Sequence, residues 1–153
     1  KLRDALEDEG GIFQTTMDSE IIVHLLAKAK ATEKDYKENF KWVLPQLQGS
    51  YSMVLMIDDT LIGARDPNGF RPLCLGKLNG SYVLASESCA LDLIQAEYIR
   101  EIEPGEVIFI NKNGIESIKM PPARRHSLCI FEYIYFARPD SNIFGKNVYL
   151  TRK

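Results

Sequence analysis

Three cysteines and two histidines are the side chains of this 153-residue chain best suited to nucleophilic chemistry or metal binding. A cysteine nucleophile needs an adjacent base, and a zinc site needs several ligands at short spacing. Cys74, Cys89 and Cys129 are scattered without a C-x-x-C pair, which argues against a disulfide framework and a self-contained zinc site. Neither His24 nor His126 is placed to suggest a base. We therefore expect three reduced, mostly buried thiols.

Asp18 is a carboxylate at the expected start of a helix. Apolar residues recur at helical spacing over 21–29, immediately after it. Asp18 or Ser19 is therefore a good N-cap for this helix. From the residues alone, capping is the favoured role of Asp18. A carboxylate has two oxygens, so capping and ligand binding are compatible.

A second polar cluster, formed by Arg138, Asp140 and Ser141, follows a run rich in aromatic residues at 128–136. The residues alone indicate a solvated loop for this cluster. Alternate positions of the run are largely apolar on both faces, which predicts an interior strand. Glu132 is the exception, and if it is buried it needs a partner such as an arginine or backbone N–H groups.

The segment at 65–76, which reads RDPNGFRPLCLG, combines turn residues with flanking apolar runs. Pro67 presets φ, Asn68 and Gly69 tolerate positive φ, and Asp66 can accept hydrogen bonds within its own turn. This composition predicts a tight hairpin connection between two core strands.

The elements that position these residues change from helices to strands near residue 51. Helical spacing predicts three helices before that point, the third capped by Thr32 with Asp35 and kinked or ended early at Pro45. The nearly continuous apolar run at 51–57 indicates a strand covered on both faces. Helices followed by strands in hairpins indicate an α+β fold with antiparallel sheets. Strands are expected at 51–57, 61–64, 71–78, 82–85, 98–102, 107–110, 115–118 and 128–136, with a short helix at 90–94.

Composition limits the class of partner. Hydrophobic residues make up 45% of the chain and charged residues 26%, as in a globular domain with a core. The net charge of −2 leaves no excess field to attract nucleic acid or an anionic membrane. No apolar run approaches the roughly 20 residues of a membrane helix. We expect a cytoplasmic protein.

Six stretches of the chain carry a family resemblance. In order they are TTMDSEIIVHLL, YSMVLMI, RDPNGFRPLCLG, ASESCAL, EIEPGEVIFI and CIFEYIYFARPDS. Together they resemble amidophosphoribosyltransferases, which use glutamine and phosphoribosyl pyrophosphate to open purine synthesis. The first five look like the glutaminase half, and the last is similar to the junction with the phosphoribosyltransferase half. The resemblance spans nearly the whole chain.

The resemblance implies a four-layer αββα sandwich of the kind found in hydrolases with an N-terminal nucleophile. An N-terminal cysteine would attack the glutamine amide with its own α-amino group as base. The released ammonia would then displace pyrophosphate at a second site, which binds Mg²⁺. On this basis residues 1–136 are a partial glutamine amidotransferase domain, and 137–153 lead toward a phosphoribosyltransferase domain absent from this chain.

The resemblance also assigns roles to individual residues. Asp18 matches the aspartate that holds the α-amino group of glutamine, as a charge-assisted hydrogen bond would. Cys129 matches a ligand of the [4Fe-4S] cluster in some members, although a buried core cysteine is the favoured interpretation. Arg138, Asp140 and Ser141 match a loop at the interface of the two domains. A homo-oligomer is also implied.

One departure from the family is large. The chain begins with Lys1, so no N-terminal thiol is present, and we expect this chain alone not to hydrolyse glutamine. It reads as a piece of something longer. Two alternatives remain open: the glutaminase domain of a hexosamine-forming aminotransferase or asparagine synthetase, and a non-catalytic binding or scaffold module with the same fold.

Overall fold

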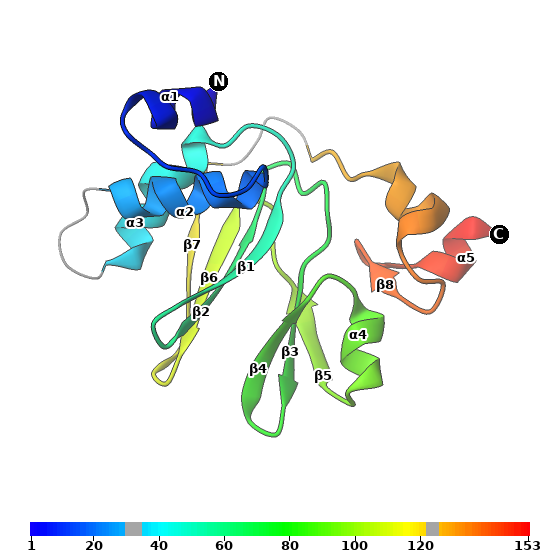
Figure 1. Cartoon of the computed structure of the whole chain (residues 1–153). Coiled ribbons are helices and arrows are strands. Elements are labelled where there is room, and N and C mark those ends of the chain that lie inside the picture. The colour runs from blue at the N-terminus through cyan, green and yellow to red at the C-terminus, as the bar shows by residue number, and fades with distance from the viewer. Residues whose placement is uncertain (30–34, 122–125) are drawn as a thin grey trace. The chain divides into compact units, whose positions relative to one another are not determined.

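The computed structural model describes residues 1–29, 35–121 and 126–153, so the expected cap at Thr32 lies outside the described residues. The chain divides into two compact units, Lys1–Gln48 and Gly49–Lys153. The first unit is helical and the second contains antiparallel sheets, which confirms the α+β class (Figure 1). None of the helices in the described residues is long and apolar enough to cross a bilayer.

The first unit packs its helices around a small apolar core. Leu6, Leu25 and Val43 are buried together. Asp35 caps α3, where its side chain accepts a hydrogen bond from the Lys37 N–H at 3.1 Å. The predicted effect of Pro45 is confirmed, because the α-helix ends before it and a 3-10 turn follows. The elements are α1 (Leu2–Asp8), α2 (Asp18–Lys28), α3 (Tyr36–Val43) and η1 (Leu44–Gln46).

Two antiparallel sheets form the centre of the second unit. The four-stranded sheet has the order β1-β2-β6-β7 and the three-stranded sheet the order β4-β3-β5. All but one of the expected strands are present with small shifts in their ends. The elements are β1 (Ser52–Ile57), β2 (Thr60–Arg65), β3 (Cys74–Leu78), β4 (Ser81–Ala85), α4 (Ser88–Leu93), β5 (Glu97–Glu101), β6 (Glu106–Asn111) and β7 (Gly114–Lys119).

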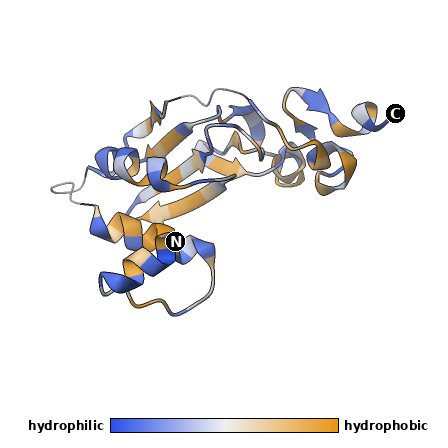
Figure 2. Ribbon diagram, turned by 90° about the horizontal axis from the view of Figure 1, so that it is seen from above, coloured by the Kyte–Doolittle hydropathy of each residue, from blue (hydrophilic) through white to orange (hydrophobic). Residues whose placement is uncertain are grey.

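The two sheets share one apolar core. Buried residues of both sheets contact one another, among them Leu75 of β3 and Ile108 of β6. The sheets approach closely at Gly63, where a Cβ atom would lie 2.8 Å from a methyl group of Leu84. Hydrophobic residues accordingly concentrate along the strands (Figure 2). The expectation that the 51–57 strand is covered on both faces is wrong for the described residues, because Met56 at this edge is 71% exposed.

The segment from Asp66 to Leu73, here called the crossover segment, is not the predicted hairpin. β2 pairs with β1 and β6, whereas β3 pairs with β4 and β5, so the segment carries the chain from one sheet to the other. The turn residues are real, but a turn signature does not determine which strands pair. The correction matters because such a segment can contact both sheets.

The predicted strand at 128–136 is also wrong, because 130–136 is helical, with π-type geometry at η2 (Glu132–Phe136). The apolar pattern of the run fits both the two-residue period of a strand and the 3.6-residue period of a helix. In the structure the helical period holds: Ile130 and Ile134 are exposed and Tyr133 and Ala137 are buried, each pair four residues apart. Aromatic and β-branched residues favoured strand over helix. Tertiary packing favoured the helix.

The C-terminal residues form a small unit of structure against η2. β8 (Asn142–Ile143) and β9 (Lys146–Asn147) pair through a turn in which Phe144 has φ of 50° and Gly145 has φ of 71°. α5 (Val148–Arg152) follows. Ile143 and Val148 are buried with Tyr133 of η2. The predicted polar loop after the aromatic run therefore contains regular structure.

Candidate functional site

Asp18 lies at the first position of α2 and is exposed. The predicted cap is wrong, because Met17 is the N-cap residue and makes no side-chain capping bond. Glu20 instead fixes the preceding loop, accepting hydrogen bonds from the N–H groups of Gln14 at 2.7 Å and Thr15 at 2.8 Å. These bonds, with that from the Thr15 hydroxyl, lower the pKa of Glu20 to about 2. The Asp18 carboxylate is exposed in the first turn of α2 and is not the cap of this helix.

Asp66 organises the start of the crossover segment. Its carboxylate is fully buried and accepts hydrogen bonds from the N–H groups of Asn68 and Gly69 at 2.9 Å and of Phe70 at 3.1 Å. Gly69 has φ of +70°, a conformation that L side chains rarely adopt. The residues that suggested a turn thus build a closed loop whose carboxylate is fully used inside it.

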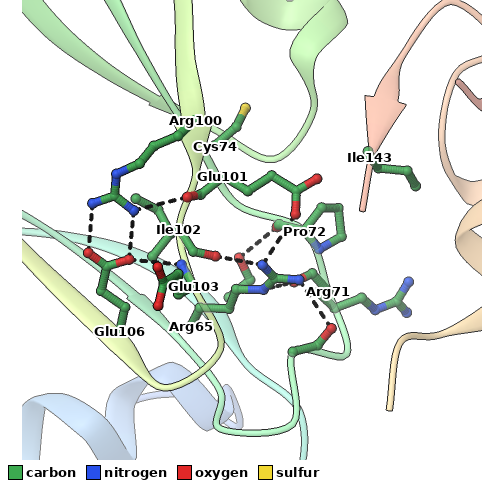
Figure 3. A network of polar contacts seen from close by, with 12 residues as sticks. Arg65, Arg71, Pro72, Cys74, Arg100, Glu101, Ile102, Glu103, Glu106 and Ile143 are labelled. Atoms are coloured by element: carbon green, nitrogen blue, oxygen red, sulfur yellow. Dashed lines mark hydrogen bonds and ion pairs between the residues drawn. The ribbon is translucent and has the colours of Figure 1, made fainter. Parts of the chain in front are cut away.

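Arg65 fastens this loop to the three-stranded sheet. Its buried guanidinium donates to the carbonyl oxygens of Arg71 at 2.8 Å, Ile102 at 2.5 Å and Gly69 at 3.2 Å (Figure 3). Burial lowers the pKa of Arg65, although the carboxylate of Glu101, 3.5 Å away, opposes the shift. Such a donor set is structural, because the guanidinium has few directions left in which to meet a substrate.

Two further arginine–glutamate pairs are present in this unit. The sheet pair joins Arg100 of β5 to Glu106 of β6 through two hydrogen bonds of 2.7 Å. Glu106 also accepts from the Glu103 N–H at 2.8 Å. Burial alone would raise the pKa of Glu106, but these hydrogen bonds outweigh it and hold the pKa below its usual value. The sheet pair is drawn in Figure 3.

The helix pair joins Arg71 of the crossover segment to Glu132 of η2 at 2.5 Å. Glu132 is buried, so the prediction that it would need an arginine in that case is confirmed. The Arg71 guanidinium also lies 4.2 Å from the centre of the Phe136 ring, within range of a cation–π interaction. The hydrogen bond to Glu132 raises the pKa of Arg71. Arg71 therefore holds η2 by both a carboxylate and a ring.

Glu87 connects two of the stretches singled out in the sequence, ASESCAL and ARPDS. One of its carboxylate oxygens accepts from the Arg138 N–H at 2.8 Å and from the Ser141 hydroxyl at 2.7 Å. The Ser88 hydroxyl accepts from the Asn142 N–H at 2.8 Å. Ser141 is fully buried, so it holds the loop in place, whereas the Arg138 side chain is exposed.

Arg138 and Asp140 form a two-bonded pair at the surface, with distances of 3.0 and 2.9 Å. The hydrogen bonds raise the pKa of Arg138 and lower that of Asp140. Both side chains are more than half exposed, so the pair contributes little to stability. It is available to a partner.

The cysteines do not form a site in the described residues. Burial raises the pKa of Cys74 to about 11 and also raises that of Cys89, so both remain protonated thiols at neutral pH. Cys129 is half-buried. No three His, Cys, Asp or Glu side chains converge as a metal site within 1–29, 35–121 and 126–153. These residues do not supply the four ligands of an iron–sulfur cluster, and Cys129 could at most be one of them.

Arg65, Arg71 and Glu87 make polar contacts between distant segments of the second unit, and the sequence alone assigned no role to them. The sequence contained a clue for the two arginines, because they flank a turn whose carbonyl groups need hydrogen-bond donors. Glu87 had no such signal, because its partners are more than fifty residues away. Asp18 lies in the first unit, and the others lie in the second.

Known proteins match this chain in both sequence and structure. Residues 1–93 match the family described as the glutamine amidotransferase domain. The chain is 45% identical to the amidophosphoribosyltransferase of Archaeoglobus fulgidus, covering 99% of this chain and 33% of that protein. It is 46% identical to the chloroplastic amidophosphoribosyltransferase 2 of Arabidopsis thaliana, covering 99% and 27%. The solved glutamine phosphoribosylpyrophosphate amidotransferase of Bacillus subtilis superposes with a TM-score of 0.90 at 44% identity, covering 99% and 33%. The chain thus spans about a third of the length of its curated relatives.

Proposed function

From the premise that this chain belongs to the glutamine amidotransferase domain family, we propose that it is the larger part of the glutaminase region of an amidophosphoribosyltransferase of purine biosynthesis. The complete protein would convert glutamine and phosphoribosyl pyrophosphate to phosphoribosylamine, glutamate and pyrophosphate. One observation carries this proposal: sequence and backbone both match the Bacillus subtilis enzyme over nearly the whole chain.

The proposal extends to the architecture. The two antiparallel sheets with their shared core would form part of a four-layer αββα sandwich. The catalytic cysteine, the second active site and its Mg²⁺ would lie outside this chain. The cytoplasmic location, the homo-oligomer and the iron–sulfur cluster stay predictions.

We assign Asp18 to the α-amino group of glutamine. Its carboxylate is exposed at the start of α2 and takes no part in capping, so a cationic ligand would meet little competition. A carboxylate–ammonium contact of this kind is a charge-assisted hydrogen bond. The loop before α2 is held by Glu20, which leaves Asp18 free to act on the ligand alone.

The Asp18→Asn variant tests this assignment in the complete protein. Loss of the charged partner should weaken glutamine binding by about 1.5–3 kcal/mol. The Michaelis constant for glutamine should therefore rise while the melting temperature stays within a few degrees. Asp8→Asn, another exposed aspartate of the same unit, is the matched control. A large fall in melting temperature with an unchanged Michaelis constant would show that Asp18 is structural.

The 153-residue polypeptide by itself should not hydrolyse glutamine. Two of its thiols are held protonated by burial, and the Glu87 carboxylate that accepts from the Cys89 thiol at 3.7 Å raises the pKa of Cys89 further. Incubation with glutamine should release no glutamate above the uncatalysed rate. Turnover on the order of 1 per second would contradict this part of the proposal.

We also propose that the C-terminal segment faces the phosphoribosyltransferase part of the complete protein. Arg138 and Asp140 are at the surface and could contact it, whereas Ser141 is buried and supports the loop from behind. The boundary at residue 136 stays a prediction.

A further inference from the structure

Six apolar side chains around η2 remain exposed although they follow one another closely. Apolar side chains exposed in this number on one short segment are typical of an interaction surface. Three of the aromatic rings contact one another edge to face or at a tilt, so the patch is an ordered surface. We call it the η2 face. Its members, each 42 to 64% exposed, are Leu128, Ile130, Phe131, Ile134, Tyr135 and Phe136.

The helix pair holds η2 on its buried side, opposite the η2 face. Glu132 lies in the same helical segment but points inward, where it meets Arg71. The Arg71 guanidinium lies against the ring of Phe136, a member of the η2 face. The Arg71 side chain therefore contacts both a buried carboxylate of η2 and a ring on its exposed side, and it orients the two together.

Arg71 itself is held firmly. Its carbonyl oxygen accepts a hydrogen bond from buried Arg65. Alongside, the Ser127 N–H donates to the Asn68 carbonyl at 2.9 Å, and the Cys129 N–H donates to the Phe70 carbonyl at 3.1 Å. The crossover segment and the start of the η2 helix thus run together as a short backbone ladder. Arg71 is a rigid support for what it holds.

A buried ion pair contributes little net stability, because the cost of removing both charges from water offsets most of the attraction between them. It is better suited to specifying one orientation where an apolar contact would allow several. The sheet pair is buried to a similar degree, but it joins β5 to β6 between the two sheets and is not part of η2. The helix pair differs in what it positions.

We propose that Arg71 and Glu132 are positioning residues that orient the η2 face for docking of the phosphoribosyltransferase part of the complete protein. This rests on the proposed function. The relatives carry about two thirds of their length outside the matched segment, which supplies an occupant. α5 contacts η2, with Arg152 donating to the Tyr133 and Ala137 carbonyls, so chain continuing from α5 would emerge beside the η2 face.

The experiment compares two ways of making phosphoribosylamine in the complete protein. Glutamine-dependent synthesis needs the two parts aligned so that ammonia passes between them, whereas free ammonia can supply the same nucleophile directly. The ratio of these two rates therefore reports alignment. The variants are Arg71→Lys, which keeps the charge but loses the fork and the ring contact, and Glu132→Gln, which keeps the shape. Arg100→Lys in the sheet pair is the matched control.

Arg71→Lys and Glu132→Gln should each lower the ratio of glutamine-dependent to ammonia-dependent rate roughly 2- to 30-fold, the range of couplings carried through packed contacts. Arg100→Lys should leave it unchanged even if its melting temperature falls as far. Equal ratios in all three variants would overturn the positioning role and leave only a structural one. A wild-type protein that supports neither reaction would overturn the proposed function, and the positioning role with it.

Discussion

The sheet pair and the helix pair are almost equally buried, yet they have different neighbours. Glu106 is 2% exposed and Arg100 40%, while Glu132 is 6% exposed and Arg71 38%. The sheet pair connects β5 and β6, and each belongs to a different sheet of the central core. The helix pair connects the crossover segment to a helix whose outer face is exposed. Burial and charge alone therefore do not determine what a pair does.

This difference predicts whether loss of each pair should change the global stability of the chain or only the local structure. Removing Arg100 leaves the Glu106 carboxylate, which is 2% exposed, between two sheets that share one core. A helix at the edge of the unit can open locally, which hydrates its buried charge without unfolding the core. Loss of the helix pair should therefore affect the η2 face more than global stability.

The largest effect should come from Arg100→Met. It leaves Glu106 buried without its guanidinium. Breaking a fully buried pair costs about 3–5 kcal/mol, and this is the upper bound here because Arg100 is 40% exposed. Arg71→Met should cost less, because local opening of η2 limits the penalty on Glu132. Urea unfolding of the 153-residue chain at neutral pH measures both. Equal losses would break the comparison and show that η2 is as firmly integrated as the sheets.

An intermediate effect should appear when pH is varied. The pKa of Glu106 is below its ordinary value of 4.5 in the folded chain, so its contribution to stability is present above that value and is lost as pH falls through the folded pKa. Arg100→Met removes the guanidinium and keeps the hydrogen bond from the Glu103 N–H, so burial is opposed less strongly, the folded pKa of Glu106 rises and its charged form becomes more costly.

The gap in unfolding free energy between the wild type and Arg100→Met should therefore be widest near pH 7 and narrow toward pH 4. Unfolding curves at several pH values give this gap directly. A gap that stays constant over this range would show that Glu106 is not the group involved. Glu106→Gln should remove most of the pH dependence of the gap.

The smallest effect should come from Ile134→Ala on the η2 face. This side chain is 56% exposed, and surface substitutions usually change stability by no more than about 0.5 kcal/mol. Ile108→Ala in β6, which is fully buried, is the control and should cost about 2–5 kcal/mol. Thermal unfolding of the chain compares them. A loss at Ile134 similar to that at Ile108 would mean that the η2 face is packed in solution.

Local signals in the sequence predicted local structure well. Pro45 marked the end of a helix because it lacks an N–H. Asp35, which was expected to pair with a cap at Thr32, is itself the N-cap of α3. The strands between residues 52 and 119 lie close to their predicted positions, since alternation and turn residues determine them locally. The need of Glu132 for an arginine was also predictable, because a buried carboxylate requires compensation.

Errors arose where distant contacts decide the outcome. The crossover segment has the residues of a hairpin turn, but the strands that flank it pair with distant partners. The residues of β3 pair with β5 at separations of 20 to 27 positions, and those of β2 pair with β6 at separations of 43 to 49. The aromatic run at 128–136 fits two periods, and only its packing on the crossover segment selects the helix. Asp18 does not cap α2 as expected, and Glu20 holds the preceding loop by accepting a hydrogen bond from the Gln14 N–H. In the site, Glu87 was missed for the same reason.

The strand order β1-β2-β6-β7 also has a consequence for the route by which the chain folds. β2 is synthesised directly after β1, but its second neighbour β6 follows only after the whole three-stranded sheet has been synthesised. Leu61 of β2 can therefore pair with Ile110 of β6 only at that later stage. Pairings this distant in sequence slow folding, because the intervening loop must close before they form. During synthesis one edge of β2 stays open to unwanted pairing until β6 arrives. The β3–β5 region is thus an obligatory early step, and mutations that delay it should reduce the yield of folded protein before they change its final stability.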